Sequence, residues 1–192
     1  DLAAGAGRPG RAAGAVAALT VVACLVGARG MWHVVNPETV IVTASDIPAA
    51  EWIAANTPPD ARFLVSTDHW HLGTYRGLDG GYWLPVLADR ATNIPPALYP
   101  YGDPARVREI TATAVIAARG DALDDAELSA LLARVGATYV YVGAAGEGAS
   151  GKLSPERLRR HPDLVEVYVR DGVHVFRQAP RGGGAPETRR RV

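Results

Sequence analysis

The chain has 192 residues, with 20 Lys and Arg against 20 Asp and Glu and a single cysteine. One cysteine excludes a disulfide scaffold, 48% apolar residues exclude a disordered protein, and zero net charge argues against a nucleic-acid-binding protein. The charge is uneven, because residues 1–44 carry +1, residues 45–178 carry 13 basic and 17 acidic groups (−4), and residues 179–192 carry +3. The sequence therefore predicts three segments, of which the middle one is a folded domain.

The first segment contains a long apolar run. Residues 1–11 show no packable periodicity, and we expect a flexible loop on the cytoplasmic side of a membrane. Residues 12–28 are uncharged, and at 1.5 Å per residue they reach about 25 Å as a helix. Residues 31–35 extend this run, so we predict a transmembrane helix over residues 12–35. Two Arg before the run and one after it favour an extracytoplasmic location for the domain on its C-terminal side.

Three interpretations of this run stay open. It is the last transmembrane helix of a larger protein, of which this chain is a fragment, or a secretory or lipoprotein signal, or a buried helix of a soluble protein. The residues before Cys24 (Val21-Val22-Ala23) have the form at which lipoprotein signals are cleaved. The apolar residues after Cys24 favour the transmembrane interpretation.

Residues 37–178 predict an α/β domain, because their apolar periodicity alternates between helix and strand types. We expect a small extracytoplasmic α/β sandwich with a short mixed sheet. The predicted helices are a first one capped by Ser45 or Asp46 and ending before Thr57, then 105–118, 125–135 and a short one opened by Ser154; the predicted strands are 62–66, 137–142, 164–170 and 173–177. Asp171-Gly172 predicts a hairpin between the last two strands.

Three stretches show no regular period. Residues 67–101 predict a long functional loop, since they combine Gly, Pro, Trp and Tyr. Residues 143–151 predict a flexible glycine-rich loop that does not fit a phosphate-binding loop. Residues 179–192, with Gly182-Gly183-Gly184 and Arg189-Arg190-Arg191, predict a disordered basic tail.

The candidate binding residues lie in the long loop. Its aromatic rings beside carboxylates suit sugar rings or peptide side chains, although packing explains many such aromatics. His69 and His71 share one face if that segment is extended, which is a spacing for a metal ion, but no third ligand is evident. No cofactor is predicted for this chain. The candidate substrate-binding residues are Asp68, His69, Trp70, His71, Asp79, Tyr82, Trp83 and Arg90.

The order of these features resembles the C-terminal region of polytopic membrane glycosyltransferases of the GT-C superfamily, over about residues 12–178. The segments that carry the resemblance are Asp46, Trp52-Ile53, Asn56-Thr57-Pro58, Asp60-Ala61, Phe63-Leu64-Val65, Asp79-Gly80-Gly81-Tyr82-Trp83 and Arg90-Ala91-Thr92. The soluble domain of oligosaccharyltransferase catalytic subunits is similar in outline. Its Trp-Trp-Asp-Tyr-Gly motif is not intact here, because the tandem Trp is missing.

The resemblance implies an enzyme of the oligosaccharyltransferase or protein-mannosyltransferase type, which moves a sugar from a lipid-phosphate donor to an acceptor that the sequence does not identify. In such enzymes the catalytic acids lie in loops between earlier transmembrane helices, so we expect no catalytic residue in this chain. The domain is expected to bind the acceptor or to cover the active site. A divalent metal is an option only for the parent enzyme. The alternative is a membrane-anchored, non-enzymatic module that binds a glycan or a protein.

Overall fold

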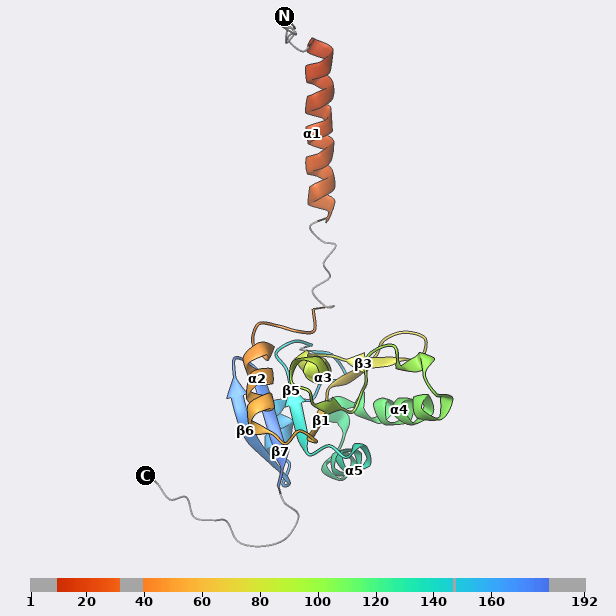
Figure 1. Ribbon diagram of the computed structural model, residues 1–192, viewed down its shortest axis with the longest axis vertical. Coiled ribbons are helices and arrows are strands. Elements are labelled where there is room, and N and C mark those ends of the chain that lie inside the picture. The colour runs from red at the N-terminus through yellow and green to blue at the C-terminus, as the bar shows by residue number, and fades with distance from the viewer. Residues whose placement is uncertain (1–9, 32–39, 147, 180–192) are drawn as a thin grey trace, which may run out of the picture. The chain divides into compact units, whose positions relative to one another are not determined.

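The computed structural model describes residues 10–31, 40–146 and 148–179, and the chain divides into two compact units, Asp1–Thr39 and Val40–Val192. The first unit contains α1 (Arg11–Met31), drawn in red in Figure 1. The predicted loop over residues 1–9 and the predicted helix extension over residues 32–35 lie outside the described residues. The same is true of the predicted tail from residue 180 onwards.

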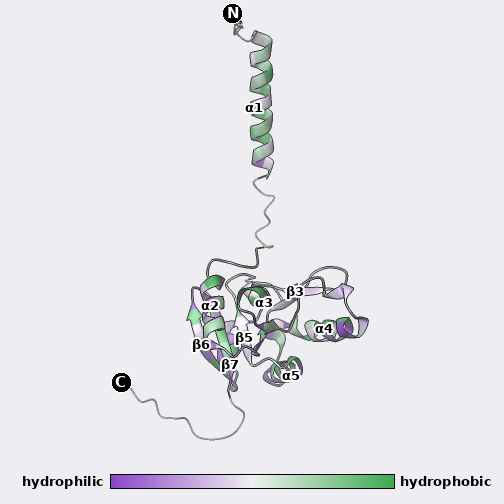
Figure 2. Ribbon diagram, viewed as in Figure 1, coloured by the Kyte–Doolittle hydropathy of each residue, from purple (hydrophilic) through white to green (hydrophobic). Residues whose placement is uncertain are grey.

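Helix α1 is largely apolar, as the mostly green ribbon in Figure 2 shows, with Arg29 in its last turn. Its segment Ala12–Met31 has a mean hydropathy of 1.9, and none of that segment is buried by the protein. Twenty residues of helix measure about 30 Å, the thickness of a hydrocarbon core. Cys24 is exposed in this helix, which continues past it to Met31. A signal sequence can have the same length and composition as this helix.

The second unit is built on a five-stranded mixed sheet of order β4-β1-β5-β7-β6. The strands are β1 (Arg62–Val65), β4 (Ala91–Thr92), β5 (Tyr139–Val142), β6 (Leu164–Arg170) and β7 (Val173–Gln178). Strand β1 pairs in parallel with β4 and β5, whereas β7 pairs in antiparallel fashion with β5 and β6. The turn between β6 and β7 is the predicted Asp171-Gly172 hairpin, in which both residues have positive φ angles of 48° and 79°.

Both faces of the sheet are covered, because neighbouring strand residues enter two different cores. Phe63, Val65 and Tyr141 pack with α2 (Asp46–Asn56) and α3 (Leu84–Leu87), and α2 lies over β6 and β7 in Figure 1. Leu64 and Val140 point the other way, towards α5 (Asp125–Val135) and α6 (Pro155–Arg159). The predicted α/β sandwich with a mixed sheet is confirmed.

Local sequence explains where the helices begin and end. Helix α4 (Pro104–Ala117) begins after Asp103, whose side chain accepts a hydrogen bond from the Arg106 amide. Helix α5 begins with a capping box between Asp124 and Glu127 and ends at Gly136, where φ is +64°. The predicted positions of α2, α4, α5 and α6 are confirmed to within two residues.

The prediction of one long loop over residues 67–101 is wrong. This region forms a hairpin of β2 (Thr67–His69) and β3 (Tyr75–Gly77), then η2 (Gly80–Trp83), α3, β4 and η3 (Tyr99–Tyr101), where η denotes a 3₁₀ helix. A further 3₁₀ segment, η4 (Gly120–Ala122), comes after α4. Elements of two to four residues are too short for an apolar period to repeat, and so the sequence pattern does not reveal them.

Candidate functional site

The hairpin β2–β3 carries four of the eight predicted binding residues. Asp68 and His69 lie on β2, and Trp70 and His71 lie in the turn after it. Leu72 and Gly73 in that turn have positive φ angles of 48° and 75°. The Trp70 ring is 53% exposed, and the Arg76 guanidinium stands over it, 5.6 Å from the ring centre. The hairpin therefore presents an indole to its surroundings, with a cation on one face.

Asp79 holds the segment after the hairpin in place through hydrogen bonds of its side chain. Its side chain is fully buried, and Oδ1 accepts a hydrogen bond from the Gly81 amide, in the first turn of η2. Oδ2 accepts from the Gly143 amide at 2.9 Å and from Lys152 Nζ at 3.0 Å. Lys152 also donates to the carbonyls of Gly143 and Ala145. The Asp79 carboxylate thus connects η2 with the loop after β5 by hydrogen bonds.

Asp46, at the start of α2, is a second buried carboxylate beside Asp79. Its Oδ1 accepts from the Tyr141 hydroxyl at 2.5 Å, and its Oδ2 accepts from the amide and hydroxyl of Thr43. Tyr141 lies on β5, in the centre of the sheet. We call Asp46, Asp79, Tyr141 and Lys152 the buried polar cluster. It joins α2, η2, β5 and the loop after β5.

Glycines allow these carboxylates to approach the backbone so closely. A Cβ atom on Gly80 would lie 2.2 Å from Asp46 Cγ, and one on Gly143 would lie 2.8 Å from Asp79 Cβ. The Gly143 position would also come within 3.0 Å of Asp46 Oδ1, so the two carboxylates stand close together around it. Gly80 and Gly143 are therefore required by close packing rather than by a special backbone angle.

Burial shifts the pKa of two members of this cluster, Asp79 and Tyr141. It raises the pKa of the Asp79 carboxyl, while the Lys152 charge and the amides of Gly143 and Gly81 act in the opposite direction. Burial, together with the hydrogen bond to Asp46, also raises the pKa of Tyr141 far above its ordinary value. Tyr141 consequently stays protonated and donates to Asp46. Both carboxylates are buried, and the cluster holds α2, η2, β5 and the loop after β5 in position.

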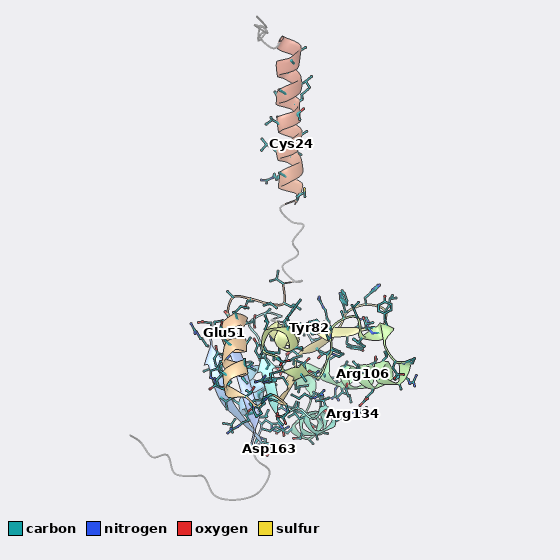
Figure 3. All side chains as sticks on the ribbon, in the orientation of Figure 1. Cys24, Glu51, Tyr82, Arg106, Arg134 and Asp163 are labelled. Carbon is teal, nitrogen blue, oxygen red and sulfur yellow. The ribbon has the colours of Figure 1, made fainter. Side chains whose placement is uncertain are left out.

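The anchored segment exposes apolar side chains. Trp83, the last residue of η2, is 43% exposed, and Val86 of α3 is 70% exposed. Leu72 of the hairpin turn is 86% exposed. We use the name aromatic surface for the exposed residues of these two segments, which are Trp70 and Leu72 in the hairpin turn and Trp83 and Val86 in η2 and α3. Figure 2 shows α3 as a hydrophobic (green) segment. Tyr82, labelled in Figure 3, lies just before α3 and packs against Gly77 of the hairpin.

Arg90 has a different environment from the one predicted. It is buried, and its five N–H groups donate to Thr57 Oγ1 and to the carbonyls of Ala54, Thr57, Ala88 and Asp89. Three of these five acceptors belong to the C-terminal end of α2, where a cation is favourable. The fork has no N–H left for a substrate. We therefore assign Arg90 and Asp79 positioning roles in place of the predicted contact with substrate.

The structure separates the two histidines. His69 ends β2 with its ring edge-on to Tyr75, 5.5 Å away, whereas His71 lies beyond the strand in the turn. Their predicted common face depended on an extended segment through residue 71. Within residues 10–31, 40–146 and 148–179 no three His, Cys, Asp or Glu side chains gather as they would around a metal ion. Asp68, His69 and His71 stay predicted substrate contacts beside Trp70.

Lys152 is the residue that sequence reasoning missed. It is the only lysine in the chain, and it comes directly after the glycine-rich stretch that predicts a flexible loop. Here Lys152 fastens the start of that loop through two carbonyls, and a Cβ on Gly151 would overlap the Thr67 carbonyl. The single lysine was the available signal, but nothing in the sequence connects it with Asp79, 73 positions away.

Comparisons with known proteins assign no family to the chain. No protein-family model matches its sequence, and no curated protein matches it significantly. The resemblance to GT-C glycosyltransferases therefore stays a prediction that rests on short sequence segments such as Asp79-Gly80-Gly81-Tyr82-Trp83.

Proposed function

We propose that the chain is the membrane-anchored, extracytoplasmic end of a GT-C-type glycosyltransferase, which transfers a sugar from a lipid-phosphate donor. In this proposal α1 crosses the cell membrane, and the catalytic residues belong to another part of the enzyme. The α/β unit covers the active site, and its aromatic surface contacts the sugar-bearing substrate. Membrane lipid, the lipid-phosphate donor and an acceptor are then its partners.

The observation that carries the proposal is the exposure of Trp83 on a segment whose start is held by buried hydrogen bonds. Trp83 keeps 43% of its surface exposed, and the hydrogen bonds of Asp79 to the Gly81 and Gly143 amides hold the short helix that carries it. Preorganised aromatic faces bind sugar rings without the entropic cost of ordering a loop. Helix α1 has the length of a membrane span, which suits a domain that works on a lipid-linked substrate.

The indole N–H signals of the chain test this proposal. The chain is placed in phosphatidylcholine nanodiscs with or without a polyprenyl-phosphate-linked hexose, and NMR follows the Trp70 and Trp83 indoles. We expect both to shift with the lipid-linked sugar and not with polyprenyl phosphate alone. Trp52, which packs against Tyr168 at 5.1 Å between ring centres, is an internal reference. Unmoved signals from Trp70 and Trp83 would remove the aromatic surface from the proposal.

The alternative function, a non-enzymatic module that binds a glycan or a protein, would also bind its ligand through the aromatic surface. The two functions differ in turnover, because only the glycosyltransferase requires that the protein carrying this chain transfers sugar. Trp83→Ala is then expected to lower transfer in the enzyme, and it would lower only binding in the module.

A further inference from the structure

A groove lined by arginines lies at the opposite end of β1 from the buried polar cluster. It has a volume of about 500 Å³, and α4, α5 and the start of β1 surround it. Arg62 begins β1, while Arg106 and Arg134 come from the two neighbouring helices and are labelled in Figure 3. Glu109 is the acidic residue among the described groove residues. The formal charge of this lining is therefore +2, in a domain segment whose net charge is −4.

These three guanidinium groups are available to a ligand. None of them forms an ion pair or a side-chain hydrogen bond with another residue in the described ranges 10–31, 40–146 and 148–179. Arg119, Arg157, Arg159 and Arg170 each pair with a carboxylate, whereas the three groove arginines have no such pair in the described ranges, as is also true of Arg108, Arg160 and Arg177. Arg134 also lies in the last turn of α5, where it complements the helix dipole. That effect does not apply to Arg62 or Arg106.

Polar groups at the back of the groove are already satisfied. Asn93 accepts from the Val65 amide and donates to Thr67, and the Thr113 hydroxyl donates to carbonyls of its own helix. A ligand is thus held by the arginines at the rim. Each guanidinium has a planar fork of N–H donors that matches the oxygens of phosphate, and several such forks together favour a multiply charged oxyanion.

We propose that this groove binds a phosphate-bearing anion through Arg62, Arg106 and Arg134. The shared chemistry is a phosphate group with two or more accessible oxygens, which either a soluble phosphate compound or a lipid headgroup supplies. This site is independent of the aromatic surface and of the proposed glycosyltransferase function.

Pyrophosphate is the first probe. The full chain in phosphatidylcholine nanodiscs is titrated with it by calorimetry, while NMR follows the arginine Nε–H signals. We expect Arg106→Gln and Arg134→Gln each to weaken binding about tenfold, since each removes a charge-assisted hydrogen-bonding fork. Arg108→Gln is the matched control, because it removes the same charge from the same helix but does not line the groove. Equal losses in Arg106→Gln and Arg108→Gln would overturn the proposal in favour of diffuse electrostatic attraction.

Misfolding of a variant would also weaken binding, so a variant that is expected to bind pyrophosphate more tightly provides a second test. Glu109→Gln removes the negative charge of the lining on an exposed helix face, and we expect severalfold tighter binding of pyrophosphate. Weaker or unchanged binding in this variant contradicts the proposed site.

A second set of nanodiscs identifies the source of the phosphate. If it is a lipid headgroup, phosphatidylglycerol in the bilayer shifts the Arg106 Nε–H signal without pyrophosphate and then competes with it. If it is a soluble compound, only pyrophosphate shifts that signal. No shift of Arg62, Arg106 or Arg134 with either probe would refute the proposal.

Discussion

Replacing Lys152 with methionine tests the buried polar cluster directly. Methionine preserves much of the length and apolar surface of the lysine stem but lacks the ammonium group. The change removes the ion pair with Asp79 at 3.0 Å and the hydrogen bonds to the Gly143 and Ala145 carbonyls. Lys152 itself is 14% exposed, whereas Asp79 is completely buried. Asp79 would be left as an enclosed carboxylate with only two backbone amides.

We expect this substitution to lower the free energy of unfolding by about 3–5 kcal/mol, the usual effect of removing one partner from a buried ion pair. The ordinary stability of a domain is about 5–15 kcal/mol, so the variant stays folded only in part at the lower end of that range. Arg159→Met is the matched control. It removes a surface cation that pairs with Glu166 and Glu156 and is 42% exposed, and we expect a much smaller loss of stability than for Lys152→Met.

Urea unfolding of the chain in nanodiscs, followed by tryptophan fluorescence, measures both variants. Asp79→Asn and the double variant complete a cycle, and we expect the two sites to couple by roughly 2 kcal/mol. A loss below about 1 kcal/mol for Lys152→Met, or additive effects in the cycle, would refute the role of Lys152 as the counter-charge of Asp79.

The remaining predictions concern packing, hydrogen bonding and pH. Gly80→Ala is expected to lower the free energy of unfolding in urea by about 1–3 kcal/mol, because its Cβ would lie 2.2 Å from Asp46 Cγ. Gly136→Ala is the control for a positive φ angle alone, since a Cβ there meets no atom within 4 Å. Equal losses of stability in the two variants would contradict the packing argument. Tyr141→Phe is expected to cost about 1–3 kcal/mol in the same assay, since it leaves Asp46 Oδ1 buried without its donor; an unchanged stability would show that this oxygen needs none. The Arg159 guanidinium lowers the pKa of Glu166, so the stabilising effect of this ion pair is present above the ordinary value of 4.5 and is lost as the pH falls through the lower folded-state value. A ¹³C titration midpoint of the Glu166 carboxyl at or above 4.5 would contradict this. Arg159→Gln should move that midpoint upward.

The sheet and its long helices were predictable because their signals are local. Leu128, Leu131, Leu132 and Val135 match the spacing of one helix face, and Asp171-Gly172 specifies its hairpin within two residues. The alternation of the two cores along β1 and β5 results from the period of two in any strand.

The site was less predictable because it depends on contacts between distant residues. Asp46 and Tyr141 are 95 positions apart, and Asp79 and Lys152 are 73 apart. Asp79 and Arg90 were identified as important residues, but a sequence does not show whether a charged side chain points outward or inward. Both turn inward here, because nearby amides, carbonyls and Lys152 satisfy them.

Exposed aromatic residues were easier to identify. Trp70 and Trp83 were predicted as ligand contacts, and the structure places both rings partly outside the core. The arginine groove was not predicted, since its residues come from three elements whose packing only the fold defines.

Sugar transfer by membranes that contain the protein carrying this chain tests whether that protein is a glycosyltransferase and whether Trp83 contacts its substrate. A radiolabelled polyprenyl-phosphate hexose is the donor, and the initial rate is compared for the unaltered protein, Trp83→Ala and Val169→Ala. Val169 is an exposed apolar residue of β6, away from the aromatic surface, and serves as the matched control. We expect transfer by the unaltered protein, at least tenfold slower transfer with Trp83→Ala at equal membrane abundance, and an unchanged rate with Val169→Ala. Absence of transfer by the unaltered protein, or an equal rate in all three, would contradict this expectation.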